Sequence, residues 1–178
     1  MPSSLTELIQ KGSIEWFVHL PHLFEKYVRR RLGALLVAHP SLRHLEVIKP
    51  RGVPHKHFAD KTANPDVLVR DAVGNAVALY DVKLYRKASL GPQNNHHHQV
   101  ESDVLSFNAA EAEEGRRGNI VHAGLIYGFW EVGEGFGSEE WKRGCYHACV
   151  RGEAAAVENA IGYALEKLVQ ELADVYHP

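Results

Sequence analysis

Two acidic residues and a lysine lie in a stretch of the sequence where apolar residues predominate. Asp66 precedes a short run of valine and leucine, and Asp81 and Lys83 lie near the end of a second apolar run. Charged side chains in apolar surroundings cost free energy unless they are paired or bind a metal ion. Carboxylates are preferred ligands of hard divalent cations, and such a cation polarises a phosphate and lowers the pKa of a bound water. These residue types therefore suit metal-dependent hydrolysis of a phosphodiester, with the lysine orienting the water or stabilising charge on the phosphate.

The two apolar runs have the pattern of a β-hairpin. Residues 67–70 and 76–83 are rich in Val, Leu and Tyr, and the residues between them include a glycine and an asparagine that tolerate the positive φ of a turn. A turn centred on residues 73–74 places Asp66 opposite Asp81, with the lysine on the same face as Asp81 because side chains alternate. A slip of one residue would send one acid to the opposite face. An exposed hairpin with an ordinary surface ion pair is the alternative.

A helix is predicted from about His19 to Ala38, because apolar residues recur there at three- and four-residue steps. Glu25 lies on the same side as Val28 and Leu32, at the edge of the buried stripe. A glutamate at such a rim is common in amphipathic helices. Together with the hairpin, however, it is a third candidate acid, which could bind a metal directly, bind it through water or act as a base.

These residues resemble the motifs of the PD-(D/E)XK nuclease superfamily. Pro65–Asp66 is similar to its PD element, Asp81–Lys83 is similar to its (D/E)XK element, and Glu25 matches the acid that many members carry on their first helix. The resemblance is strongest to the McrC-type nucleases, the cleaving subunits of modified-cytosine restriction systems, over the segments Leu23–Val28, Asn64–Val69 and Tyr80–Tyr85. It covers about residues 15–130. It implies DNA as substrate, Mg²⁺ or Mn²⁺ as cofactor, metal binding by Asp66, Asp81 and Glu25, and a catalytic set of Glu25, Asp66, Asp81 and Lys83.

The chain departs from the McrC-type pattern in two respects. Those proteins carry an extra N-terminal region that docks on a GTP-hydrolysing motor, whereas only about two dozen residues precede Glu25 here. A motor or other partner subunit and a homodimer are both left open. The family also often has a glutamine and an aromatic residue four apart on the next helix. Gln99, Asp103 and Phe107 follow one another here at four-residue steps, and either Gln99 or Asp103 could take the place of that glutamine.

Basic residues concentrate in the first half of the chain, although the formal net charge is −2. Acidic residues gather later in the sequence. This polarity allows a local phosphate-binding face on a nearly neutral protein, while each basic group alone could be a solvated surface. The candidate DNA contacts are Arg29, Arg30, Lys56, Arg86, Lys87 and Gln99.

The composition is typical of one globular domain spanning residues 1–178. The chain is long enough to bury a core, and it contains no apolar run long enough to span a membrane and no signal sequence. We therefore expect a cytoplasmic protein without membrane association. Cys145 and Cys149 do not suggest a disulfide framework. With His147 they could bind zinc from one strand face, but a buried pair of free thiols fits better because no fourth ligand is obvious.

The remaining pattern predicts an α/β fold. Further strands are expected at 45–49, 119–130 and 145–150, and further helices at 99–114 and 153–176. Loops are expected at 51–64, 90–98 and 133–144, the second of which contains His96–His98, one of which could reach a phosphate. The order of these elements corresponds to the restriction-endonuclease-like αβββαβ core that the resemblance implies, a mixed central sheet flanked by helices.

The leading interpretation is a Mg²⁺-dependent DNA endonuclease of restriction or defence type. A junction-resolving or DNA-repair nuclease would use the same chemistry. A non-catalytic nucleic-acid- or protein-binding module of the same fold is the alternative from another class, and the intact set of three acids and a lysine argues against it.

Overall fold

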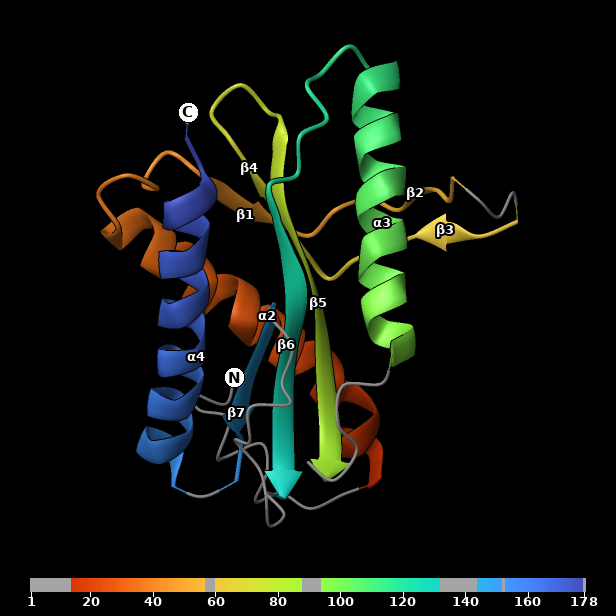
Figure 1. The fold of residues 1–178 in the computed structure, drawn as a ribbon. Helices are drawn as coiled ribbons and strands as arrows, with labels where there is room; N and C mark the ends of the chain where they lie inside the picture. Colours follow the sequence, from red (N-terminus) through yellow and green to blue (C-terminus); the bar gives the residue numbers. More distant parts are fainter. Residues whose placement is uncertain (1–13, 57–59, 88–93, 132–143, 152, 178) are drawn as a thin grey trace.

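The structure, a computed structural model, describes residues 14–56, 60–87, 94–131, 144–151 and 153–177. Over these residues the chain forms a mixed α/β fold with a five-stranded sheet, a separate two-stranded sheet and three helices (Figure 1). The helices are α2 (Ile14–Ala38), α3 (Asn94–Glu113) and α4 (Ala154–Val175). The strands are β1 (Glu46–Ile48), β2 (Val53–Pro54), β3 (Thr62–Ala63), β4 (Val67–Arg70), β5 (Ala76–Lys87), β6 (His122–Glu131) and β7 (Cys145–Cys149).

The main sheet is mixed, in the order β1-β4-β5-β6-β7. β1, β4 and β5 are antiparallel neighbours, whereas β5, β6 and β7 are parallel. The long strands β5 and β6 therefore run side by side through the middle (Figure 1), and the apolar run predicted as a buried central strand is β6. Parallel neighbours need a crossover connection, and α3 supplies it between β5 and β6.

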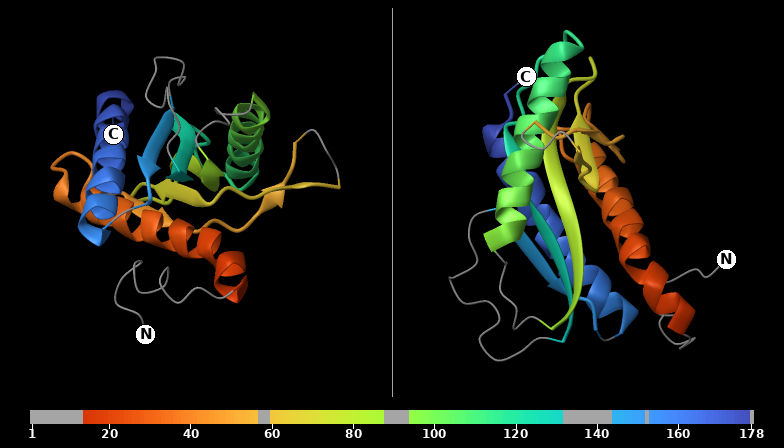
Figure 2. Two further views of the ribbon diagram at one scale, coloured as in Figure 1. Left: turned by 90° about the horizontal axis from the view of Figure 1, so that it is seen from below. Right: turned by 90° about the vertical axis from the view of Figure 1, so that its right-hand side faces the viewer.

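The two faces of the sheet are covered by different helices. α2 and α4 pack on one face, and α3 packs on the other (Figure 2). Side chains of β5 alternate accordingly: Tyr80 and Val82 belong to the cluster under α2 and α4, while Leu79 belongs to the cluster under α3. Asp81 lies between Tyr80 and Val82 in the chain, so its side chain is directed to the α3 face.

The turn between β4 and β5 is stabilised by its own residues. Asp71 Oδ1 accepts hydrogen bonds from the backbone N–H groups of Val73 at 3.0 Å and Asn75 at 2.8 Å. Gly74 has φ +89°, which favours glycine because it has no Cβ. The predicted turn and the two predicted strands on either side of it are confirmed.

Two of the predicted loops contain regular structure. The segment 51–64 contains the β2–β3 hairpin, which extends sideways past α3 (Figure 1). The prediction of a loop at 90–98 is wrong for residues 94–98, because α3 begins at Asn94. No apolar period marks these residues as helical, and the side chains of His96 and His97 instead contact the sheet. The predicted loop at 133–144 lies outside the described residues except for Gly144.

The helix ends agree with the sequence more closely than the helix starts. α3 stops just before Gly115, whose φ of +71° and backbone hydrogen bond to Ala112 form the predicted glycine C-cap. α2 begins at Ile14, earlier than the predicted start near His19, and continues through Pro21. Within the described ranges, none of the helices combines the length and apolarity that crossing a membrane requires.

Candidate active site

The register of the β4–β5 hairpin brings two aspartates together. Val67 pairs with Tyr80, so the next position along each strand sets Asp66 opposite Asp81, as predicted. The backbone N–H of Val82 donates a 2.8 Å hydrogen bond to Asp66 Oδ2. Because this bond ties the Asp66 side chain to the strand that carries Asp81, the two carboxyl groups converge on the face covered by α3.

Lys83 completes this group of charges on β5. Its Nζ lies 2.7 Å from Oδ2 of Asp81, which is only 2% exposed. The contact is an ion pair without the directional geometry of a hydrogen bond, and Oδ2 has no hydrogen-bond partner among the described residues. Burial alone would lower the pKa of Lys83, but its contact with Asp81 and the charges of Asp81 and Asp66 raise it. The ammonium therefore stays protonated at neutral pH.

The surroundings of Asp66 disfavour its charged form and raise its pKa. Burial raises its pKa to about 6, and the Asp81 carboxyl adds to the shift as a hydrogen-bond partner and as a like charge, while the Val82 N–H and Lys83 oppose it. The partly buried Asp66 and the buried Asp81, with one lysine, carry an excess of negative charge, which a nearby cation would neutralise. Two facing carboxylates that have one lysine beside them are a suitable donor set for a hard divalent cation.

The protein supplies this donor set from two residues. Over the ranges that the structure describes, no group of three or more His, Cys, Asp or Glu side chains is arranged to hold a metal ion. Mg²⁺ is commonly bound through one or two carboxylates and retains several waters. The Asp66–Asp81 pair fits that mode of binding without a third direct ligand from the protein.

Glu25 approaches the hairpin from the other side of the sheet. Its Oε2 lies 3.4 Å from His22 Nδ1 and 3.9 Å from Arg29 Nη1. The same Arg29 nitrogen donates a 2.9 Å hydrogen bond to the backbone carbonyl of Asp66. The structure therefore links Glu25 to the backbone of the site through Arg29, and does not bring its carboxylate into a metal-holding group with Asp66 and Asp81.

The other predicted DNA-contacting residues are not gathered at one point. Arg30, Lys56 and Gln99 are exposed, on α2, just after β2 and on α3 respectively. Arg29 is largely buried by its contacts with Glu25 and Asp66, with 13% of its side chain exposed. Arg86 and Lys87 end β5, but their side chains lie outside the described ones.

Asp103 joins the site from α3. It is 3% exposed, and its Oδ2 is buried without a hydrogen-bond partner among the described residues. Burial raises its pKa to about 6, Lys83 acts to lower it and Asp66 acts to raise it. From the sequence, Asp103 was predicted only as a candidate substitute for a family glutamine. The helical period was a stronger signal, because Val100 and Phe107, three residues before and four after, are both buried.

His96 is also held near Lys83. Tyr85 Oη lies 3.1 Å from His96 Nε2, and Tyr127 Oη lies 3.1 Å from His96 Nδ1. Burial lowers the pKa of His96, and the charge of Lys83 lowers it further. The ring is therefore neutral at pH 7, with each nitrogen beside a tyrosine hydroxyl. His98, two residues later, is exposed and faces Glu101.

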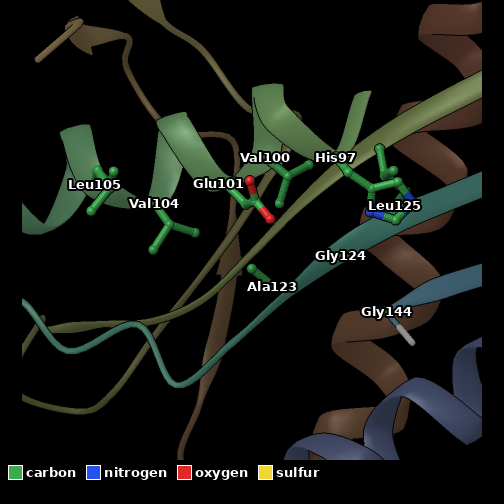
Figure 3. Close-up of a pocket in the computed structure, with 9 residues that line it drawn as sticks. All are labelled: His97, Val100, Glu101, Val104, Leu105, Ala123, Gly124, Leu125 and Gly144. Atoms are coloured by element: carbon green, nitrogen blue, oxygen red, sulfur yellow. The ribbon is translucent and has the colours of Figure 1, made fainter. Parts of the chain in front are cut away.

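A separate cavity of about 550 Å³ lies beside this site, between α3 and β6 (Figure 3). Val100, Val104 and Leu125 make it largely apolar, and His97 and Glu101 line it as well. Nearby, His97 Nε2 lies 3.4 Å from Cys145 Sγ. The zinc site considered from Cys145, His147 and Cys149 does not form a metal-holding group in the described part of the chain, where both cysteines are free thiols.

No protein-family model, no curated protein and no solved structure matches the chain. The inference of function therefore rests on the residues of the site.

Proposed function

We propose that the protein is a Mg²⁺-dependent DNA endonuclease with a restriction-endonuclease-like αβββαβ core, active in restriction or defence against foreign DNA. The observation that carries the proposal is the β4–β5 register, in which Asp66 lies opposite Asp81 and Lys83 shares the face of Asp81. The two carboxylates are a donor set suited to the cation of metal-dependent phosphodiester hydrolysis, and the lysine beside them is suited to bind a water or a phosphate oxygen.

Asp66 and Asp81 are the residues that would hold the cation, Mg²⁺ or Mn²⁺. Their two negative charges exceed the single positive charge of Lys83, which favours a doubly charged ligand over water alone. A divalent cation bound there polarises the phosphate and lowers the pKa of a bound water. The hydrogen bond from Val82 N–H orients Asp66 before any cation arrives, so little reorganisation is needed on binding.

Lys83 is proposed to act on the reacting groups. Its ammonium is fixed by Asp81 and remains protonated, so it can donate to a water or to a phosphate oxygen. In the second role it stabilises the negative charge that develops on the phosphate in the transition state.

Glu25 is proposed to assist from α2 by binding the cation through water or by accepting a proton from the attacking water. Its contact with Arg29, and the hydrogen bond from Arg29 to the Asp66 carbonyl, support a role at the rim of the site. Arg29 also fixes the backbone that carries Asp66, so substitution of either residue is expected to act partly through that backbone.

DNA is the proposed substrate because exposed cationic groups lie on the segments that border Asp66. Arg30 is on α2, and Lys56 is in the hairpin that leads directly into Asp66. Gln99, Arg86 and Lys87 are further proposed contacts. Such groups bind the phosphate backbone without regard to sequence. A homodimer or a motor subunit would then supply the remainder of the specificity.

A non-catalytic nucleic-acid- or protein-binding module is the second candidate. It is favoured by one observation: the described residues offer two convergent carboxylates and no third one in a metal-holding arrangement. A junction-resolving or repair nuclease differs from the leading proposal only in the DNA structure it acts on.

A cleavage assay with several substrates separates these candidates. Purified protein is incubated with plasmid, cytosine-methylated and branched DNA, and with RNA, in Mg²⁺, in Mn²⁺ and in excess EDTA. We expect cleavage of DNA with either cation and none with EDTA, because the proposed nucleophile is a water that the cation activates.

Full cleavage in EDTA would refute the metal-dependent mechanism. Absence of cleavage under every condition, with retained binding of DNA in a gel-shift assay, would favour the binding module. Preference for branched over linear DNA would identify a junction-resolving or repair nuclease in place of a restriction enzyme.

A further inference from the structure

Asp103 is a buried acid with an unused acceptor. Its side chain comes from the middle of α3, it is 3% exposed, and Oδ2 has no hydrogen-bond partner among the described residues. Buried polar atoms in folded proteins nearly always have a partner, and the exceptions often mark a functional site. The position of Asp103 on the helix therefore needs an explanation beyond packing.

The electrostatic surroundings of Asp103 are those of the candidate active site. Lys83 and Asp66 are the two charged groups whose fields act on it, with opposite signs. Both belong to the hairpin face that α3 covers. Asp103 thus lies across from the metal-holding pair, on a different element of the fold.

The backbone around Asp103 is fixed by neighbouring serines. Ser102 Oγ lies 2.7 Å from His55 Nε2, and Ser106 Oγ accepts a 3.0 Å hydrogen bond from the backbone N–H of Lys56. Ser106 also donates to the carbonyl of Ser102 at 2.9 Å. These contacts hold this part of α3 against the segment that follows β2, so Asp103 is presented from a rigid support.

We propose that Asp103 is a positioning residue of the metal site, whose Oδ2 accepts a hydrogen bond from a water bound to the divalent cation held by Asp66 and Asp81. The inference rests on the proposed function. A water bound to a cation is a strong donor, and Oδ2 is an acceptor with no other donor within reach among the described residues.

Indirect binding through water fits better than direct ligation. The described acids do not form a group of three around one point, as direct ligation by Asp66, Asp81 and Asp103 would require. Mg²⁺ retains several of its waters when it is bound by two carboxylates. Groups that hydrogen-bond to the ligands of a metal orient them and tune its affinity.

The test is a calorimetric titration of Mn²⁺ into the full chain without DNA, at neutral pH. Asp103→Asn is compared with wild type, with Asp81→Asn, and with Glu101→Gln. Glu101→Gln is a matched control because it removes one negative charge from the same helix, at an exposed position. We expect Asp103→Asn to weaken Mn²⁺ binding about tenfold. Glu101→Gln should leave the affinity within about twofold of wild type, since its charge is exposed and screened.

A second measurement distinguishes a water-mediated contact from a direct one. The proton relaxivity of water reports how many waters each bound Mn²⁺ carries. The proposal expects the same number in wild type and Asp103→Asn, and an increase of one water in the variant would overturn it. Asp103→Leu, which removes every polar atom, is measured as well in case the asparagine finds a new partner, and thermal melting verifies that each variant is folded.

The outcomes separate this inference from the proposed function. If wild type binds Mn²⁺, Asp81→Asn loses it, and both folded Asp103 variants bind as wild type does, the role of Asp103 is refuted while the metal site stands. If wild type binds no Mn²⁺, the proposed function fails and the inference fails with it.

Discussion

The N-terminal half of α3 (residues 94–103) and its C-terminal half (residues 104–113) each bury a carboxylate, and the two carboxylates have opposite surroundings. Glu111, near the C-terminal end, accepts hydrogen bonds from Arg70 at 2.8 and 3.1 Å and from Arg116 at 2.8 and 3.0 Å. Asp103, nearer the N-terminal end, is buried to a similar degree, at 3% exposed against 2% for Glu111, yet its Oδ2 has no partner among the described residues.

The same contrast appears in their pKa values. Burial by itself would raise the pKa of Glu111, but the hydrogen bonds and charges of Arg116 and Arg70 outweigh it and lower the pKa to about 2. Burial raises the pKa of Asp103 to about 6, and the single lysine nearby does not offset it. Arg70 and Arg116 therefore neutralise the charge of the Glu111 carboxylate, whereas Lys83 offsets only part of the effect of burial on Asp103.

The presence or absence of hydrogen-bond partners distinguishes a buried acid that stabilises this fold from one that is a candidate for a functional role. Leaving a buried acceptor unsatisfied costs about 1–3 kcal/mol, and a fold has no use for that cost by itself. Glu111 connects β4, α3 and the segment after α3, so it stabilises the fold. Asp103, Asp66 and Asp81 have Lys83 as their shared cationic neighbour among the described residues, so they keep a net negative charge, which would favour a cationic ligand.

The largest effect is expected from Asp81→Asn. Cleavage should fall at least about a thousandfold, equivalent to about 4 kcal/mol of activation free energy, because one of the two carboxylates proposed to hold the cation is lost. The melting temperature without metal should change little, because the lost repulsion with Asp66 and the lost ion pair with Lys83 act in opposite directions. Single-turnover cleavage and thermal melting measure the two quantities. Unchanged cleavage by a folded variant would mean that the hairpin is not the active site.

Glu111→Gln should produce the opposite result. Removing the acid leaves the partly buried Arg70 without its ion-pair partner, while Arg116 keeps its contact with Glu114. The loss should lower the free energy of unfolding by about 3 kcal/mol. Cleavage per folded molecule should not change. Urea denaturation tests this, with the exposed Glu113→Gln on the same helix end as control. A loss of activity without a loss of stability in Glu111→Gln would contradict a purely structural role of Glu111.

The contributions of Glu111 and Asp103 to stability should also change in opposite directions with pH. The Glu111 contribution to stability is present above its usual pKa of 4.5 and is lost as pH falls towards 2, so the stability gap between wild type and Glu111→Gln should close over that range. The contribution of Asp103 is present below its usual pKa of 3.8 and is lost as pH rises through about 6. Wild type should therefore lose stability relative to Asp103→Asn between these values in EDTA. Urea denaturation across the pH series checks both trends, and parallel curves for all three proteins would contradict them.

The smallest effect is expected from Ser106→Ala. Ser106 connects the Asp103 end of α3 to the backbone of Lys56, and its loss should cost about 1 kcal/mol in urea denaturation. Activity should fall a few-fold, because the support of Asp103 loosens. The variant Ser41→Ala, at an exposed position distant in the chain, is the control. Equal activity of Ser106→Ala and wild type would show that the Asp103 end needs no such support.

Local signals in the sequence were sufficient for the hairpin and for much of the fold. Asp71, Gly74 and Asn75 form the turn among themselves, and the turn sets the register that brings Asp66 opposite Asp81. The strands β4, β5 and β6 and the end of α3 at Gly115 were predictable for the same reason, because alternation, apolar runs and a glycine cap act over a few residues.

Other features depended on contacts between distant segments. The start of α3 at Asn94 was missed because His96 contacts Tyr85 and Tyr127 on two strands, and no local period announces such contacts. The β2–β3 hairpin was missed because its strands are very short and it is attached to α3 through Ser102 and Ser106.

The sequence by itself determined which acids share the hairpin, because the turn and the two-residue alternation of a strand are local properties. Only the tertiary structure decided which helix covers them. α3 connects the parallel strands β5 and β6 and lies on the face of Asp81, so Asp103 lies on the same face as the two aspartates. α2 lies on the other face, and Glu25 is linked to Asp66 through Arg29. The face that a helix covers follows from the order of strands in the sheet and from burial of both apolar faces, which no single segment encodes.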